Sequence, residues 1–129
     1  MTGTSRLETN KQAVLGFYEA AFNTKDFDTA ATFVGDRYVQ HNPLIADGID
    51  GLKARLAYVK EAFPALRVEA RRLVAEGDYV VAHVHGVRTP GQRGLAIVDI
   101  FRLEDGKLVE HWDVMQDIPG DSLNQNGMV

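Results

Sequence analysis

The sequence lacks cysteine, long apolar runs and an excess of basic residues. Among its 129 residues there is no cysteine, so disulfide bonds and thiolate chemistry are excluded. No run approaches the roughly 18 apolar residues that a membrane-spanning helix needs, and the polar residues 1–10 lack the apolar segment of a signal peptide. A cytoplasmic location is therefore expected. The net charge of -4 argues against nucleic acid or an anionic membrane as the main partner.

What is present fits one globular domain over residues 1–129. Hydrophobic residues make up 45% of the chain and charged residues 25%, as in ordinary globular proteins. No internal repeat or linker divides the sequence. We expect an ordered core over about residues 7–117, a disordered start over residues 1–6, and a loose tail from Asp117 onward.

Helical spacing of apolar residues predicts three helices in the N-terminal half. The first is expected to begin near Thr9, where Gln12 completes a capping box. The second, capped by Asp26, is predicted over residues 27–34. The third is predicted over residues 48–63. These helices precede the part of the chain in which the pattern changes.

From residue 66 onward, alternating apolar residues predict strands. Four runs, residues 66–75, 79–87, 94–103 and 108–116, are separated by glycine-containing turns. A short extended segment over residues 38–43 precedes the third helix, because a residue before proline avoids the helical region. Helices followed by an antiparallel meander indicate an α+β domain with its helices against one face of the sheet.

The two C-terminal hairpins decide which side chains share a face. We expect a three-residue loop over residues 104–106 with a bulge, which sets His111 opposite Asp99. A two-residue Asp-Gly turn would shift this register by one residue. A five-residue loop over residues 89–93 sets His83 opposite Asp99 as well. Because directly opposed Cβ atoms lie about 5 Å apart, imidazole and carboxylate can then touch.

These registers gather ionisable side chains on the core face of the sheet. The inward face is predicted to hold His83, His85, Asp99, His111 and Asp113. The outward face is predicted to show Val98, Ile100, Leu108, Trp112 and Val114. That set is too apolar for open water, and a second copy of the chain is its natural cover. We therefore expect a homodimer through this face.

Two segments carry a family resemblance. YVQHNP at residues 38–43, and VDIFR, DGK and EHWD between Val98 and Asp113, resemble the signatures of SnoaL-like proteins of the nuclear transport factor 2 superfamily. The resemblance spans about residues 9–116, and the second segment is the more specific. It implies a cone-shaped α+β barrel in which a strongly bent, mostly antiparallel sheet wraps three helices and leaves an apolar pocket. It also implies pairing through the sheet.

The resemblance also implies a chemistry. In the polyketide cyclases of the family, the position matching Asp113 is a carboxylate that acts as general acid/base in an intramolecular aldol closure, without metal or cofactor. The chain departs from that pattern at Asp99, where those cyclases tend to carry histidine. The superfamily also contains dehydratases, isomerases, epoxide hydrolases and non-catalytic binders, so the fold alone does not define the function.

The predicted catalytic residues are Asp113, Asp99, His111 and His83. Asp113 is the candidate base, because desolvation in an apolar pocket makes a carboxylate a better proton acceptor. The alternative is a structural ion pair. Asp99 bound to His83 or His111 can orient the imidazole to donate a proton, or it can simply satisfy a buried polar group.

The predicted substrate-binding residues are His41, Asn42, Tyr18, Phe101, Ile97, His85 and Met115. His41 and Asn42 can donate hydrogen bonds to a developing enolate oxygen, although Asn42 can equally stabilise a turn. Tyr18 can supply a hydroxyl or belong to the core. The spacing His83-x-His85 is compatible with two metal ligands from one strand, but the resemblance favours metal-free chemistry, and we predict no metal and no cofactor.

The expected function is that of a cofactor-independent lyase or isomerase of the aldol cyclase or dehydratase type. Asp113 would remove a proton next to the carbonyl of a small hydrophobic, polyketide-like substrate, and a histidine would protonate the oxygen. Two alternatives remain open. One is a non-catalytic small-molecule binding protein of the same fold, and the other is a metal-dependent enzyme.

Overall fold

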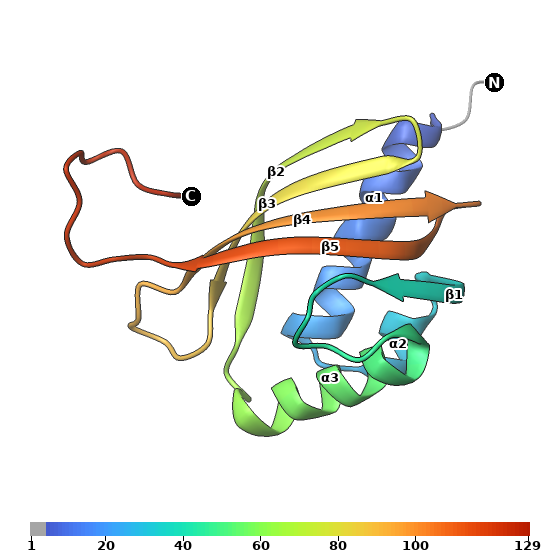
Figure 1. Cartoon of the computed structure of the whole chain (residues 1–129), viewed down its shortest axis with the longest axis horizontal. Helices are drawn as coiled ribbons and strands as arrows, with labels where there is room; N and C mark the ends of the chain where they lie inside the picture. Colours follow the sequence, from blue (N-terminus) through green and yellow to red (C-terminus); the bar gives the residue numbers. More distant parts are fainter. Residues whose placement is uncertain (1–4) are drawn as a thin grey trace.

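The computed structural model describes residues 5–129 and contains three α-helices and a five-stranded sheet, whose first strand precedes the third helix in the chain (Figure 1). The helices are α1 (Arg6–Tyr18), α2 (Phe27–Ala31) and α3 (Gly48–Ala62), and a π-helical turn, η1 (Glu19–Asn23), continues α1. The strands are β1 (Val34–Gln40), β2 (Arg67–Glu76), β3 (Tyr79–Val87), β4 (Leu95–Glu104) and β5 (Lys107–Asp117).

The sheet has the order β1-β5-β4-β3-β2, and only the β1–β5 pair is parallel. It curls along α1, while α3 lies beneath the β1 side and runs toward the start of β2 (Figure 1). The core between them contains Phe17 of α1, Phe101 and Leu103 of β4, and Leu108 of β5. The expected α+β architecture, with three helices on a bent and mostly antiparallel sheet, is confirmed.

Helix α1 begins earlier than predicted. The hydroxyl of Ser5 accepts a hydrogen bond from the Glu8 N–H at 3.2 Å, so Ser5 and not Thr9 is the N-cap. Thr9 lies inside the helix, where its N–H bonds the Ser5 carbonyl at 2.9 Å. Of the start predicted to be disordered, residues 1–4 lie outside the described residues, whereas Arg6 is already helical.

Helix α2 is shorter than predicted, and the following strand is longer. Asp26 caps α2 as expected, since its carboxylate accepts from the Thr29 N–H at 3.3 Å. The helix ends at Ala31, and Val34 begins a strand that pairs with β5. The Phe33 carbonyl already accepts from the Leu108 N–H at 2.9 Å. Pairing with the edge of the sheet therefore replaces the last helical turn that apolar spacing predicted.

The β4–β5 hairpin differs from the expected three-residue loop. Its turn consists of Asp105 and Gly106, both at positive φ (50° and 76°), as a two-residue type I′ turn requires. A bulge at Arg102 and Leu103 then shifts the register by one more residue, which sets Asp99 opposite Asp113. The predicted pairing of Asp99 with His111 as directly opposed residues is therefore wrong.

The β3–β4 register is offset by one residue from the prediction. His83 lies opposite Val98, and Gly86 lies opposite Leu95. Because a one-residue shift exchanges the faces of a strand, His83 and His85 point outward, and both predictions of an inward position are wrong. This register brings the backbone of residue 94 close to the Gly86 carbonyl oxygen, and glycine at position 94 permits that approach. The φ of Gly94 is +85°, and a Cβ there would lie 2.2 Å from the Gly86 carbonyl oxygen.

The outward face of the sheet is partly apolar. Val98 is 41% exposed and Val114 is 74% exposed, as predicted for this face, whereas Ile100 and Trp112 are half-buried. Leu108 is fully buried, so its predicted outward position is wrong, because the bulge turns it into the core. Pairing of two copies through this face stays a prediction.

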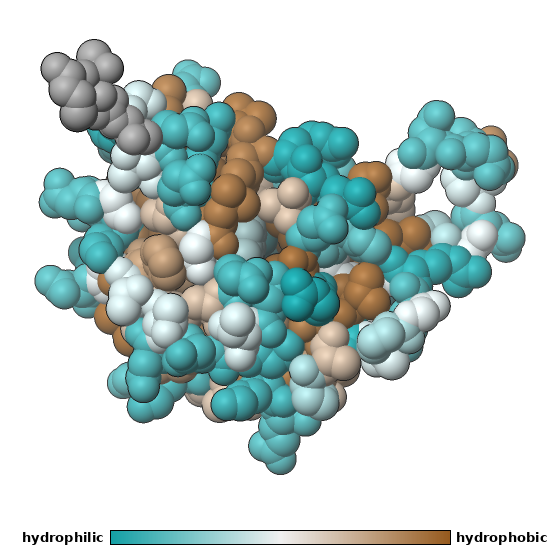
Figure 2. All heavy atoms as spheres, turned by 180° about the vertical axis from the view of Figure 1, so that it is seen from behind, coloured by the Kyte–Doolittle hydropathy of each residue, from teal (hydrophilic) through white to brown (hydrophobic). Residues whose placement is uncertain are grey.

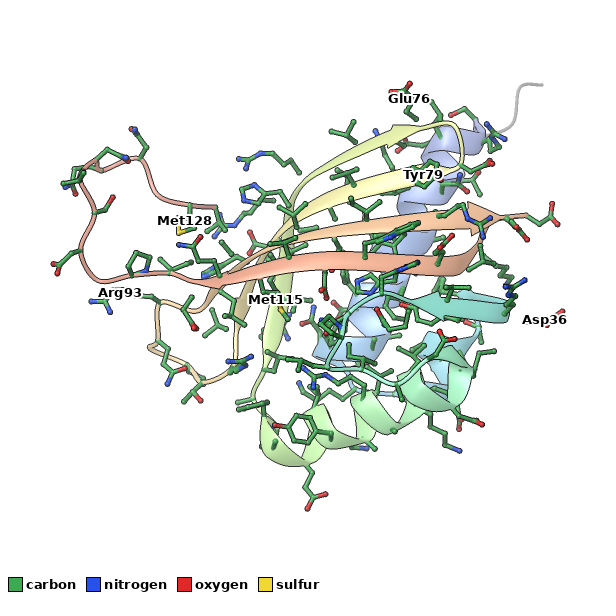
Figure 3. The ribbon with its side chains drawn as sticks, in the orientation of Figure 1. Asp36, Glu76, Tyr79, Arg93, Met115 and Met128 are labelled. Atoms are coloured by element: carbon green, nitrogen blue, oxygen red, sulfur yellow. The ribbon has the colours of Figure 1, made fainter. Side chains whose placement is uncertain are left out.

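The C-terminal tail leaves the sheet after Asp117 and then returns to it (Figures 1 and 3). It has no regular secondary structure, and most of its residues are exposed, as expected. Its end is nevertheless bound, because His83 Nε2 lies 2.8 Å from the Met128 carbonyl oxygen.

Seen from behind, a mainly hydrophilic surface carries a band of apolar side chains across its middle (Figure 2). None of the helices within residues 5–129 is both long and apolar enough to cross a membrane.

Candidate functional site

A cavity lies between the inward face of the sheet and helices α1 and α3. It measures about 880 Å³, including the space open to solvent at its mouth, and most of its walls are aromatic or aliphatic side chains. Eight of the predicted site residues line it: Asp113, Asp99, His111, Asn42, Tyr18, Phe101, Ile97 and Met115. Figure 3 shows Met115 beside β5, on the side toward α3. The predicted residues His41, His83 and His85 do not line this cavity.

Asp99 is buried, and both of its carboxylate oxygens are occupied. The Tyr18 hydroxyl of α1 donates to Asp99 Oδ2 at 2.6 Å, and His111 Nε2 lies 2.9 Å from Asp99 Oδ1. Burial, and secondarily the charge of Asp99, raises the pKa of Tyr18 well above its ordinary value of 10.0. The phenol is therefore a neutral donor throughout the neutral pH range, and it holds the carboxylate in place.

The hydrogen-bond network fixes the tautomer of His111. Gln40 Oε1 accepts the backbone N–H of Asn42 at 3.0 Å, so this atom is an acceptor. His111 Nδ1, which is 2.8 Å from the same oxygen, must then carry a proton. The bond between Nε2 and Asp99 requires one more proton, on either the ring or the carboxylate. The His111–Asp99 pair therefore holds one transferable proton.

Asp113 is less occupied than Asp99. The side-chain amide of Asn42 donates to its Oδ1 at 2.8 Å and to its Oδ2 at 3.0 Å. The Leu44 N–H in turn donates to Asn42 Oδ1, which turns the NH₂ group toward Asp113. His111 Nε2 is 3.7 Å from Asp113 Oδ2, beyond hydrogen-bond distance. In the described part of the chain, Asn42 is the only side chain that donates a hydrogen bond to Asp113.

Together these groups form an acid–base set at the inner end of an apolar cavity. Asp113 is oriented by an amide and keeps lone pairs free to accept a proton. The proton-bearing His111–Asp99 pair lies beside it. A base and an acid within one small site can remove a proton from carbon and donate a proton to oxygen.

Within residues 5–129, the same three side chains form the one group that could hold a metal ion. One ligand atom each from Asp99, His111 and Asp113 lies within 4.8 Å of the others, and the His111 Nδ1–H bond to Gln40 resembles the second shell of a metal-bound imidazole. The amide of Asn42 already donates to both oxygens of Asp113, so a metal ion at this carboxylate would share the oxygens with that amide or displace it. The predicted ligand pair on β3 points to the other side of the sheet, away from this set.

His41 lies outside the cavity, although its neighbour Asn42 lies inside. Its ring stacks on Trp112 with centroids 4.6 Å apart, and its Nε2 lies 2.7 Å from Glu110 Oε2. Arg102 Nε donates to the other oxygen of Glu110 at 2.8 Å. His41 therefore belongs to an ionic cluster on the outward face, and its predicted position at the pocket mouth is wrong.

The histidines of β3 have structural partners. His83 is bonded to Arg72 through Nδ1 and to the Met128 carbonyl through Nε2. His85 Nε2 lies 2.8 Å from the Arg93 carbonyl oxygen. Carbonyl oxygens only accept, so each Nε2 donates. These rings connect the sheet to the C-terminal tail and to the β3–β4 loop.

Sequence reasoning missed four polar residues of the cavity: Tyr38, Gln40, Arg55 and Arg88. The first two had a signal, because Tyr38, Gln40 and Asn42 are spaced by two along an extended segment. The buried Tyr38 ring stacks on His111 with an interplanar angle of 11°. Arg55 had a weaker sequence signal, since it follows Leu52 by three residues on the inward side of α3.

Comparisons with known proteins agree with this architecture. Residues 12–120 match the model of a family described as SnoaL-like polyketide cyclase. The structure of TsrD from Streptomyces laurentii is similar with a TM-score of 0.72 and 26% sequence identity, over 88% of this chain and 91% of that chain. No protein of curated function matches the chain significantly.

Two further solved structures are similar in fold. A Bacillus cereus protein proposed to be a polyketide cyclase has a TM-score of 0.74 and 23% identity, over 87% of this chain and 78% of that one. A nuclear transport factor 2-like protein of unknown function from Cytophaga hutchinsonii has a TM-score of 0.70 and 17% identity, over 90% and 95% of the two chains. The fold is thus the nuclear transport factor 2-like α+β cone.

Proposed function

The chain belongs to the family of SnoaL-like polyketide cyclases, and from that premise we propose that it is a cofactor-independent lyase or isomerase. Its substrate would be a small hydrophobic carbonyl compound of the polyketide type, and its reaction an aldol closure or a dehydration. The observation that carries the proposal is the unequal partnering of two carboxylates of the cavity. Within residues 5–129, Asp99 is bonded to the phenol of Tyr18 and the imidazole of His111, whereas both oxygens of Asp113 accept only from the side-chain amide of Asn42.

In the proposed reaction, Asp113 acts as the base. Its carboxylate takes a proton from the carbon next to the carbonyl, and the electron pair of that C–H bond moves into the carbonyl, which becomes an enol as His111–Asp99 donates its proton to the oxygen. The enol carbon then attacks a second carbonyl of the same molecule and forms the C–C bond. Asp113 returns its proton to the new alkoxide, and the enol proton returns to the His111–Asp99 pair, so closure leaves the protein unchanged.

Tyr18 and Gln40 act as positioning residues in this scheme. Tyr18 fixes Asp99, and Gln40 keeps the Nδ1 proton of His111 in place, so that only Nε2 exchanges a proton. Asn42 orients Asp113 in the same way. The support for this scheme is geometric, because every polar partner of the two acids is itself fixed by a hydrogen bond or by burial.

A non-catalytic binding protein of the same fold is the second candidate. The feature that favours it is Asp99 itself, which occupies the position where the resembling cyclases tend to carry histidine and which has both oxygens satisfied. In that case the polar set would only orient a ligand. Pairing of two chains, a cytoplasmic location and the metal-dependent alternative stay predictions of the sequence.

The test compares Asp113→Asn with Glu110→Gln, a matched change of acid to amide on the outward face of the same strand. With aromatic polyketide-like ketones and cyclic enones as substrates, we expect Asp113→Asn to lose turnover by roughly a hundredfold or more while ligand affinity is kept. Glu110→Gln should stay within about twofold of the wild type. Turnover retained by Asp113→Asn would exclude the proposed base, and binding without turnover by the wild type would favour the binding protein.

A further inference from the structure

Two arginines line the otherwise apolar cavity at a distance from its acidic end. Arg55 comes from α3, and Arg88 directly follows β3. Arg88 lies next to the end of β3 where Gly86 pairs with Leu95, which is four residues along β4 from Asp99. At about 3.3 Å per residue, this places the backbone near Arg88 roughly 13 Å from that of Asp99. Both arginines are half-buried, whereas Asp99 and His111 are buried, so the arginines lie nearer the mouth.

Neither guanidinium has an acidic partner. Over residues 5–129, no carboxylate oxygen lies within 4.0 Å of Arg55 or Arg88, and neither side chain makes a hydrogen bond. Asp117 lines a neighbouring hollow together with Arg88, but the ion pairs found within residues 5–129 do not join these two residues. By contrast, Arg102 on the outward face binds two glutamates. The two cavity arginines thus keep their N–H donors free.

Aromatic rings hold both guanidinium groups. Arg55 Cζ lies 5.2 Å from the centre of the Tyr58 ring, and Arg88 Cζ lies 5.1 Å from that of Phe63. The two rings contact each other edge to face, with centroids 6.2 Å apart. Stacking on a ring leaves the edge of a guanidinium free, and that edge matches the two oxygens of a carboxylate. The rings of Tyr58 and Phe63 therefore connect Arg55 on α3 with Arg88 in the β3–β4 loop.

We propose that Arg55 and Arg88 bind a carboxylate group of the ligand, whose apolar body fills the cavity. The charges of the cavity then orient the ligand, because Asp99 and Asp113 repel an anion at the inner end while the arginines attract it at the mouth. The reactive carbonyl would be delivered to Asp113. The delivery of the carbonyl rests on the function proposed above, whereas the binding of a carboxylate does not.

The test compares two ligands that differ in charge and share one ring system, 2-naphthoate and 2-naphthamide, by isothermal titration calorimetry. We expect the wild type to bind the carboxylate at least tenfold more tightly than the amide, a preference typical of charge-assisted bonds. The double variant Arg55→Gln/Arg88→Gln should bind both ligands within about twofold of each other and keep its affinity for the amide. The control Lys53→Gln/Lys60→Gln removes the same charge from α3 outside the cavity and should keep the preference.

The inference is overturned if the wild type does not bind 2-naphthoate, if it binds the two ligands with equal affinity, or if the preference survives in the arginine variant. A preference lost equally in the lysine control would assign it to the general field of the protein and would also overturn it. Asp113→Asn separates this inference from the proposed function. If that variant keeps the carboxylate preference and the wild type shows no turnover, the arginine site stands and the proposed reaction fails; turnover without a preference gives the opposite result.

Discussion

The two faces of the sheet carry the same kinds of side chain in different arrangements. On the inward face, His111 is bonded to the side chains of Asp99 and Gln40 beneath apolar walls. On the outward face, His83 is bonded to Arg72 and to the Met128 carbonyl. Both rings use both nitrogens. The difference lies in what those nitrogens contact.

The contacts decide whether a histidine can exchange a proton with a ligand. His83 donates from Nε2 to a carbonyl and accepts on Nδ1 from an arginine, so its neutral form satisfies every partner. His111 donates from Nδ1, and its Nε2 faces a carboxylate, so one proton is shared between two acceptors inside the cavity. Partners and burial therefore distinguish His83, whose two nitrogens have fixed donor and acceptor roles, from His111, whose Nε2 shares a proton with a carboxylate.

The largest difference between the two faces is expected when one histidine on each face is replaced with leucine. His111→Leu leaves an oxygen of the buried Asp99 without a partner, and we expect a loss of about 3 to 5 kcal/mol in the free energy of unfolding. His83→Leu acts on a half-buried ring, and its loss should stay below about 1 kcal/mol. Urea denaturation at pH 7 measures both. Losses of equal size would show that the two faces do not differ in the way proposed.

Tyr18→Phe removes a single oxygen from the inward network. Asp99 Oδ2 then loses its donor at 2.6 Å while remaining buried, and we expect a destabilisation of about 1 to 3 kcal/mol. Tyr79→Phe on the exposed side of β3 is the matched control, with an expected effect below about 0.5 kcal/mol. Thermal unfolding of both variants at pH 7 gives the difference. A Tyr18→Phe protein as stable as the control would mean that water replaces the hydroxyl.

The inward grouping of Asp99, His111 and Asp113 was predictable even though the hairpin was not. The expected loop was one residue too long, and the bulge at Arg102 and Leu103 was unforeseen. Their combined effect moves β5 by two residues relative to the predicted register. Because side chains alternate with a period of two, an even shift preserves the face. The helices and strands were also predictable, because each has a characteristic spacing of apolar residues along the chain.

A single-residue shift had the opposite effect on β3. A five-residue loop over residues 89–93 predicts that His83 and His85 point inward. The close approach of Gly94 to the Gly86 carbonyl, which sets the observed register, has no signature in the spacing of apolar residues. The unpaired state of Arg55 and Arg88 was equally hidden, because it depends on which acids of distant segments come near. The β3–β4 register and the partners of the two arginines depend on contacts between distant segments, and local patterns in the sequence do not predict such contacts.

The last prediction concerns the ionic cluster of the outward face, in which Glu110 is bonded to Arg102 and His41. Arg102 above all, and His41 after it, lowers the pKa of Glu110 from its usual 4.5. The stabilisation is therefore fully present above pH 4.5 and is lost as the pH falls through the lower pKa of the folded state. Glu110 is 18% exposed, so solvent screening limits the gain to about 1 kcal/mol.

Glu110→Gln should accordingly reduce the free energy of unfolding at pH 7 and have little effect at about pH 2, where the wild-type carboxyl is also protonated. The more exposed Glu104 binds the same arginine, so Glu104→Gln should change stability by less at both pH values. Urea denaturation across this range gives the two curves. If Glu110→Gln destabilised the protein equally at pH 7 and at about pH 2, Glu110 would stabilise the fold through packing and not through its charge. The outward cluster would then depend on packed contacts, as the buried inward network does.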